Sequence, residues 1–283
     1  MASFRFLALS FLGVCLAGAA VAQQTTPPAE KSAGAGFRPE PGQGLRSPLD
    51  RPPQPPEPLT PETRGDIYMA RKMYREAIEV YRECLAAAQK AGTPKDKLAI
   101  LTNKIGIGYH QLMELPIAKK HYEQAIKLHP KYSEAINNLG TVHYANRSYR
   151  RAIGQYKKAL RLSPYSASIH SNLGTAHFAR KKYKEAVEAY QKALELDPEV
   201  FEHRSTHGVL MQERTVQERA RFYYYLSKVY AKAGANERAL MYMRKALEEG
   251  FKDRQKFLEE PEFAALKELP EFQQLMAMEP RVL

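Results

Sequence analysis

The chain has 283 residues, with 43 Lys and Arg against 31 Asp and Glu, and it contains only two cysteines. This length is sufficient to bury a continuous core, and two cysteines exclude a disulfide-rich scaffold. The net charge of +12 favours anionic partners over cationic ones.

The first 22 residues have the pattern of an export signal. Arg5 gives a positive start, residues 6–19 are uncharged and largely apolar, and Ala20-Val21-Ala22 forms a small-x-small cleavage site. We therefore expect residues 1–22 to be a signal peptide and the protein to be exported, with the periplasm as the expected compartment. Two alternatives stay open, namely secretion and anchoring by an uncleaved signal, although the apolar stretch is short for a bilayer span.

Residues 23–59 form a second segment, which holds ten prolines and four glycines and shows no apolar periodicity. This composition predicts a disordered, partly polyproline-like tether. Thr60, Pro61 and Glu62 then supply a helix cap, a proline at the first helical position and an early acid, so helical order is expected to begin there.

Beyond the tether, the same residue types recur at a step of 34. Four sets of markers follow this step: Gly106, Gly140 and Gly174; Ala118, Ala152 and Ala186; Tyr122, Tyr156 and Tyr190; and Pro130, Pro164 and Pro198. Within one period, Ile136, Leu139, Gly140 and His143 form one helical stripe, and a second stripe follows a short loop. Two short helices of this kind cannot bury their stripes alone, so neighbouring hairpins must stack.

These residues closely resemble the tetratricopeptide (TPR) repeat. Asn138-Leu139-Gly140 and Asn172-Leu173-Gly174 match its Asn-Leu-Gly run, and residues 193–198 (Ala-Leu-Glu-Leu-Asp-Pro) match its ending, although the chain lacks the usual tryptophan. The resemblance implies an all-α fold, a right-handed α-solenoid of stacked helix-turn-helix hairpins. It also implies a scaffold that holds a protein or peptide partner.

The register predicts the domain organisation. We expect a TPR array over 60–250, a C-terminal helical cap over 251–283, and five repeats at about 58–91, 99–132, 133–166, 167–200 and 220–253. The insertion over 199–219 contains His203 and His207, which are four residues apart, but no third ligand is apparent, so no metal site is predicted. At its end, Thr215-Val216-Gln217-Glu218 is a capping box from which the next helix should start.

The resemblance also implies which side chains meet a partner, because the first helix of each TPR hairpin lines a concave groove. The residues at groove positions are Asn103, His110, Asn137, Thr141, Tyr144, Ser171, Thr175, Phe178, Tyr224 and Lys228, with Lys232 beside them. We expect the two asparagines to bond a peptide backbone, the aromatic residues to give flat contacts, and the lysines to meet an acidic group.

The largest basic cluster lies elsewhere, on the hairpin turns and second helices. It comprises Arg147, Arg150 and Arg151, followed one period later by Lys181, Lys182 and Lys184. Stacking would place these residues in a ridge. The ridge has two interpretations, a solvated face or a surface that binds anionic lipid or an envelope polymer.

The chain shows no motif of catalysis: it has no Gly-rich phosphate loop, no Gly-x-Ser-x-Gly elbow, no His-Glu-x-x-His and no cysteine pair. We therefore expect neither enzyme activity nor a cofactor, and export makes nucleic acid an unexpected partner. The main hypothesis is a non-catalytic scaffold in the cell envelope that binds a protein through its groove. The alternative is a surface-association module that uses the basic ridge. Oligomeric state and partner identity stay open.

Overall fold

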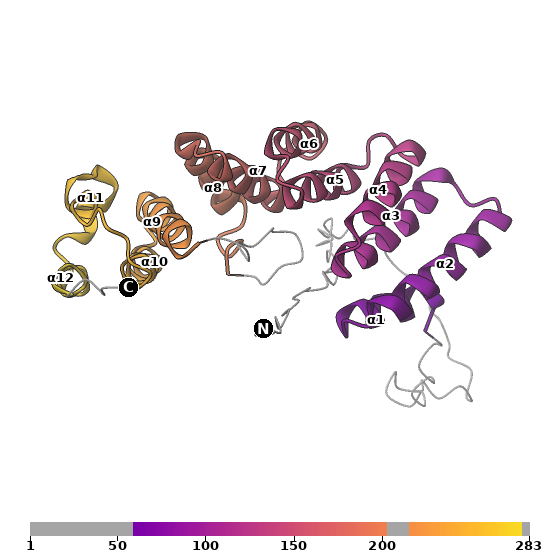
Figure 1. Ribbon diagram of the computed structural model, residues 1–283, viewed down its shortest axis with the longest axis horizontal. Helices are drawn as coiled ribbons and strands as arrows, with labels where there is room; N and C mark the ends of the chain where they lie inside the picture. The colour runs from indigo at the N-terminus through magenta and orange to yellow at the C-terminus, as the bar shows by residue number, and fades with distance from the viewer. Residues whose placement is uncertain (1–58, 203–214, 279–283) are drawn as a thin grey trace, which may run out of the picture. The chain divides into compact units, whose positions relative to one another are not determined.

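The computed structural model describes residues 59–202 and 215–278, and all regular secondary structure in these ranges is helical. Ten of the helices form antiparallel pairs that contact each other and are labelled in Figure 1: α1 (Pro61–Ala70) with α2 (Tyr74–Lys90), α3 (Lys95–Gln111) with α4 (Leu115–Leu128), α5 (Ser133–Ala145) with α6 (Tyr149–Leu162), α7 (Ala167–Ala179) with α8 (Tyr183–Leu196), and α9 (Val216–Lys232) with α10 (Asn236–Glu248). The second helix of each pair also contacts the first helix of the next pair. This succession of contacts confirms an all-α solenoid of stacked hairpins.

The predicted signal peptide, nearly all of the predicted tether, and His203 and His207 lie outside the described residues. Within the described ranges, no helix combines the length and the apolar character needed to cross a bilayer.

A glycine of the first helix lies against a tyrosine of the second helix in four hairpins. A Cβ atom added to the glycine would lie within 2.8 Å of the ring in each pair: 2.5 Å for Gly65 and Tyr81, 2.7 Å for Gly106 and Tyr122, 2.6 Å for Gly140 and Tyr156, and 2.5 Å for Gly174 and Tyr190. The four rings are at most 1% exposed. Glycine is therefore required at this position because any side chain would push the ring, and with it the second helix, away.

The fifth hairpin departs from this rule. Ser227 stands at the glycine position, is completely buried, and donates its hydroxyl to the carbonyl of Tyr224 at 2.7 Å. Met243 stands where the other hairpins have tyrosine. An unbranched thioether adapts to a small neighbouring side chain more easily than a rigid ring does, so serine is tolerated here.

The hairpin turns share a feature that the sequence analysis did not anticipate. The same turn position adopts a left-handed backbone in all five hairpins, with φ between 54° and 74°, at Lys72, Met113, Arg147, Lys181 and Gly234. Only the fifth turn uses glycine, which adopts this conformation freely, whereas the other residues carry a cost of about 1 kcal/mol each.

The C-terminal segment consists of α11 (Gln255–Glu259), the 3₁₀ helix η2 (Pro261–Leu266) and α12 (Pro270–Ala277). Its apolar side chains are almost completely buried, and they are Phe257, Phe263, Leu266, Phe272 and Leu275. Because η2 contacts α9 and α12 contacts α10, this segment covers the last hairpin. The predicted short helical cap is therefore confirmed.

The predicted capping box is also confirmed. The backbone N–H of Glu218 donates to the Thr215 hydroxyl at 3.2 Å, and the backbone N–H of Thr215 donates to the Glu218 carboxylate at 3.2 Å. These two bonds satisfy amide groups at the start of α9 that have no partner within the helix.

Two glycine substitutions test the contact between the helices of a hairpin. Gly140→Ala is expected to lower the free energy of unfolding by about 1–3 kcal/mol, because the new methyl group meets the Tyr156 ring. Gly154→Ala is the matched control, since a Cβ there meets no atom within 4 Å and alanine favours the helix by about 1 kcal/mol. Urea unfolding followed by circular dichroism measures both effects, and stabilisation by both substitutions would contradict the packing argument.

Candidate functional site

The first helices of neighbouring hairpins are joined by side-chain amides at one repeated spacing. Asn138 Nδ2 donates to Asn103 Oδ1 at 3.1 Å, and Asn172 Nδ2 donates to Asn137 Oδ1 at 3.0 Å. The residues of each pair are 35 positions apart, so the second bond repeats the first one hairpin later. Together they tie α3 to α5 and α5 to α7, which also touch directly. We call this set the asparagine ladder.

An ion-paired equivalent of the ladder joins α1 to α3. Lys104 stands one hairpin before Asn138, and its Nζ lies 2.7 Å from both Glu62 Oε1 and Asp66 Oδ1. Burial is the largest single influence on the pKa of Lys104 and lowers it, but hydrogen bonds and charge from the two carboxylates together raise that pKa above its usual value. The ladder therefore continues across the inserted residues between the first two hairpins, with a charge pair in place of amides.

Most of the predicted partner-binding side chains are buried. Seven are between 2% and 8% exposed: Asn103, Asn137, Thr141, Ser171, Thr175, Phe178 and Tyr224. Their polar groups are used inside the array, since Thr141 donates to the carbonyl of Asn138 at 2.7 Å and Thr175 donates to the carbonyl of Ser171 at 3.0 Å. The expected free hydrogen-bonding edge is thus largely occupied by contacts within the array, because stacking brings adjacent first helices within side-chain reach.

The aromatic members of the predicted set pack at the C-terminal end of the array. Phe178 lies 5.6 Å from Phe222 and 5.9 Å from Tyr225, measured between ring centroids, and Tyr224 stacks on Phe251 at 4.4 Å. These rings form the core between α7, α9 and the C-terminal segment, so their packing explains their burial.

Lys228 is also committed within the chain. Its Nζ lies 2.8 Å from Glu260 Oε2 and 3.3 Å from Glu262 Oε1, and the three side chains are 20–24% exposed. The C-terminal segment thus already supplies the acidic groups that the sequence analysis assigned to a partner. At Lys228, the candidate surface is covered by the chain itself.

Three of the predicted residues retain access to solvent. His110 and Tyr144 are half-buried, and Lys232 is exposed, with its Nζ donating to Gln191 Oε1 at 3.4 Å. Asn138, which the sequence analysis did not select, is half-buried beside them. We define the first-helix face as four half-buried residues on α3 and α5: Ile107, His110, Asn138 and Tyr144. Contact of a partner with any of these residues stays a prediction.

His110 combines an imidazole with a buried phenol. Its Nδ1 lies 3.4 Å from the hydroxyl of Tyr122, and the two rings are 6.3 Å apart. Burial lowers the pKa of His110 to about 4, so the ring is neutral at neutral pH. A neutral ring gives the first-helix face a flat, weakly polar contact and adds no charge.

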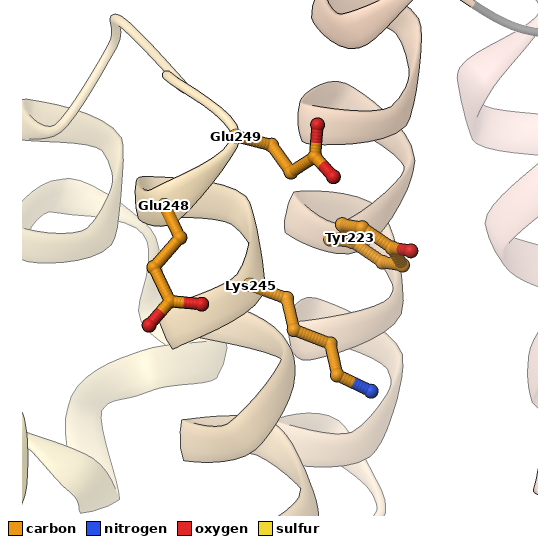
Figure 2. A pocket seen from close by; sticks show the side chains of 4 residues that line it. All are labelled: Tyr223, Lys245, Glu248 and Glu249. Carbon is orange, nitrogen blue, oxygen red and sulfur yellow. The ribbon is translucent and has the colours of Figure 1, made fainter. Parts of the chain in front are cut away.

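A separate hollow lies between α9 and α10, lined by Tyr223, Lys245, Glu248 and Glu249 (Figure 2). Its charges are largely used within the protein: Glu249 accepts two bonds from Arg219, at 2.9 and 3.3 Å, and Lys245 lies over the Tyr242 ring at 4.9 Å. Across the ranges that the structure describes, no three His, Cys, Asp or Glu side chains gather as metal ligands. The Arg219–Glu249 pair and the Lys245–Tyr242 contact around this hollow therefore stabilise the last hairpin.

Family comparison agrees with the repeated architecture. One tetratricopeptide repeat profile matches residues 59–131, and another matches 112–167 and 137–200, so together they cover half of the chain. The chain belongs to the tetratricopeptide repeat family. TPR proteins are generally non-catalytic scaffolds that bind protein or peptide partners.

Individual relatives are more distant. The uncharacterized protein ycf37 of Guillardia theta is 32% identical over 79 residues, which are 28% of this chain and 43% of that protein, so the match spans less than half of the relative. Among solved structures, MamA is 22% identical, with 65% of this TPR chain and 93% of that chain covered and a TM-score of 0.43. BtubC (BKLC) from P. vanneervenii is 21% identical, with 67% and 78% covered and a TM-score of 0.47.

The asparagine ladder gives a stability prediction. Asn172→Ala leaves the buried Asn137 carbonyl without its donor and is expected to lower the free energy of unfolding by about 1–3 kcal/mol. Because Asn137→Ala removes the same bond, the double variant should cost less than the sum of the single changes, with a coupling of about 1 kcal/mol. Asn146→Ala, at an exposed turn residue, is the control. Additive effects in a urea-unfolding double-mutant cycle would show that the ladder is not an energetic unit.

His110 gives a prediction on pH. Its pKa is about 4 when folded and near 6.5 when unfolded, so its contribution is complete above pH 6.5 and is lost as pH falls toward 4. In His110→Gln, the loss of stability between pH 7 and pH 4 should shrink by on the order of 2 kcal/mol. Comparison of the variant with the parent at pH 7 separates any packing effect. An unchanged pH dependence would contradict a buried neutral ring.

Proposed function

We propose that this TPR protein is a scaffold that binds a partner protein on the first-helix face. The supporting observation is the asparagine ladder, which holds α3, α5 and α7 in fixed register, while His110, Tyr144 and the ladder residue Asn138 remain partly accessible. A face that is ordered before binding costs less conformational entropy when a partner docks.

The chemistry of the face suggests an extended peptide segment as the bound element. Half-buried Ile107 and Tyr144 offer apolar contact, and the half-buried Asn138, whose amide nitrogen bonds Asn103, adds a polar group on α5. At the C-terminal end, exposed Arg221 and Lys232 add positive charge. We therefore propose a partner segment with apolar side chains and an acidic group at one end.

We further propose that this scaffold acts outside the cytoplasm, in the cell envelope. The support is the sequence pattern alone: a positive Arg5, the apolar stretch over 6–19 and the small-x-small site at residues 20–22. Detection of mature protein beginning at Gln23 in an envelope fraction would support export, and a cytoplasmic protein of full length would contradict it.

Site-specific photo-crosslinking tests the partner face. A benzophenone amino acid at Tyr144 should yield an adduct with a defined partner in the native host, because that side chain lies on the first-helix face. The same group at Glu188, an exposed residue of the second helix α8, is the matched control and should give no such adduct. Equal labelling from both positions would contradict the proposal.

Substitution of the same face provides the quantitative arm. Tyr144→Ala combined with Ile107→Ser should weaken binding of the cross-linked partner at least tenfold, because apolar contact area is lost. Binding through this face should change little between low and high salt, since its accessible groups are mostly uncharged. Unchanged affinity in the double variant, with helicity intact, would exclude the first-helix face.

A further inference from the structure

Helix α6 carries an unusual charge pattern for a second helix of this array. It holds five basic residues and no acidic residue, and all five side chains are exposed: Arg150, Arg151, Lys157, Lys158 and Arg161. Each of the other four second helices, α2, α4, α8 and α10, contains at least one glutamate. Helix α6 therefore carries more net positive charge than any other helix of the described array.

Among the residues that the structure describes, no carboxylate forms an ion pair with the basic residues of α6. None of the five makes an ion pair with any residue in 59–202 or 215–278. On adjacent second helices the pattern differs, since Lys119 pairs with Glu123 at 3.5 Å and Lys182 pairs with Glu185 at 3.1 Å. Of the predicted ridge, Lys182 is thus paired with a carboxylate, whereas Arg150 and Arg151 on α6 form no ion pair within the described residues.

An arginine-lined hollow lies at the start of α6. Its volume is about 510 Å³ and its lining consists of Arg147, Ser148, Tyr149, Arg150, Arg151 and Arg180, with no carboxylate among them. Arg150 and Arg151 stand in the first turn, where cations are disfavoured by the partial positive charge of the helix terminus. A bound anion offsets this repulsion, and guanidinium groups match the oxygen geometry of a phosphate.

Gly154 leaves the middle of the α6 outer face bare. Unlike Gly140, which packs on Tyr156, Gly154 is exposed, and a Cβ added there meets nothing within 4 Å. Glycine inside a helix costs about 1 kcal/mol relative to alanine, and no packing contact accounts for it here. The absence of a side chain between the basic residues lets a flat surface approach the helix closely.

Two exposed apolar side chains lie at and just after the end of α6. Leu162 is 38% exposed, and Tyr165 is 81% exposed, more than any other large apolar side chain that the structure describes. Tyrosine and leucine beside lysine and arginine are the composition of a surface that rests at the headgroup level of a bilayer. A soluble polyanion provides no environment for these two side chains.

We propose that the outer face of α6, from Arg147 to Tyr165, docks on the surface of an anionic phospholipid bilayer. The arginine-lined hollow takes a lipid phosphate, the lysines meet the negative surface, and Tyr165 enters the headgroup region. Because this face belongs to a second helix, it is distinct from the first-helix face. The scaffold can therefore rest on a membrane while its partner site remains unoccupied or filled.

The absence of tryptophan from the chain allows a local test. In the full chain, Tyr165→Trp introduces a single fluorophore at the proposed contact. Its emission should shift to shorter wavelength on vesicles of phosphatidylglycerol and phosphatidylcholine, and it should not shift on phosphatidylcholine alone. Leu258→Trp, at a position 40% exposed on the C-terminal segment, should not shift on either vesicle and controls for binding by the apolar stretch over 6–19.

Charge removal then assigns the contact to α6. In the Tyr165→Trp reporter, changing Arg150, Arg151, Lys157 and Lys158 to Gln should weaken binding to the anionic vesicles about 100-fold. The matched control changes four exposed lysines elsewhere, Lys90, Lys95, Lys97 and Lys131, to Gln and so removes the same charge. It should bind within about threefold of the parent, and circular dichroism checks that both variants remain helical.

The outcomes are distinct. An emission shift of the Tyr165→Trp reporter that survives the α6 substitutions, or an equal loss in both charge variants, overturns docking through this face. A third outcome also overturns docking on a bilayer. If the protein binds inorganic polyphosphate, loses that binding on the α6 substitutions and shows no emission shift on anionic vesicles, the ligand is a soluble polyanion. Failure of this test leaves the crosslinking result at Tyr144 unaffected, because the two faces lie on different helices.

Discussion

The contact between a first-helix glycine and a second-helix tyrosine is the constraint on which this array depends. It brings the two helices of four hairpins together closely enough that a single methyl group would not fit. Burial of each ring contributes about 2 kcal/mol, and the ring also fixes how far apart the helices stand. Since each hairpin stacks on the next, an error in one spacing would shift the stripe that the neighbouring hairpin must cover. In the fifth hairpin, where Ser227 replaces the glycine, the tyrosine is replaced as well, by Met243.

A second constraint acts between hairpins and determines what remains for function. Lys104, Asn138 and Asn172 each reach back to the preceding first helix, so polar groups that appear suited to a ligand instead hold the array in register. A buried amide is costly without a partner, and the ladder supplies that partner between α3 and α5 and between α5 and α7. The face left for recognition is consequently narrower than the repeat pattern suggests, and it lies on α3 and α5. On α9, Lys228 is paired with Glu262 of η2 and with Glu260, the residue just before η2.

The fold was predictable from the sequence because its determinants are local and periodic. The step of 34, the stripe of Ile136, Leu139 and Gly140, and the capping box at Thr215 each specify structure within a few residues. The accessibility of the groove residues was not predictable in the same way. Whether the Asn137 amide is available to a partner depends on a side chain in the next hairpin. Asn172 bonds that amide because it lies 35 residues further on, one more than the period of 34. The partners of Lys228 come from a segment outside the repeat, so no register could place them. The left-handed turns at Met113 and Arg147 could not be predicted from the sequence, because neither residue type favours that conformation.

The outer faces of the second helices differ in charge from one hairpin to the next. A first helix packs against neighbours on several sides, whereas the exposed side of a second helix has no packing role and is free to vary. On α2, α4, α8 and α10 that freedom is filled with mixed charge, which suits a solvated surface. The outer face of α6 instead carries five basic residues and Gly154, whose added Cβ would meet no described atom within 4 Å. The exposed Tyr165 follows three residues after the helix ends. The like charges and the glycine weaken an isolated helix, through repulsion and lost helix propensity, and Tyr165 adds exposed apolar area just beyond the helix end. An anionic bilayer surface would offset the repulsion and take up the exposed apolar area, and these two effects are the basis of the docking proposed for this face.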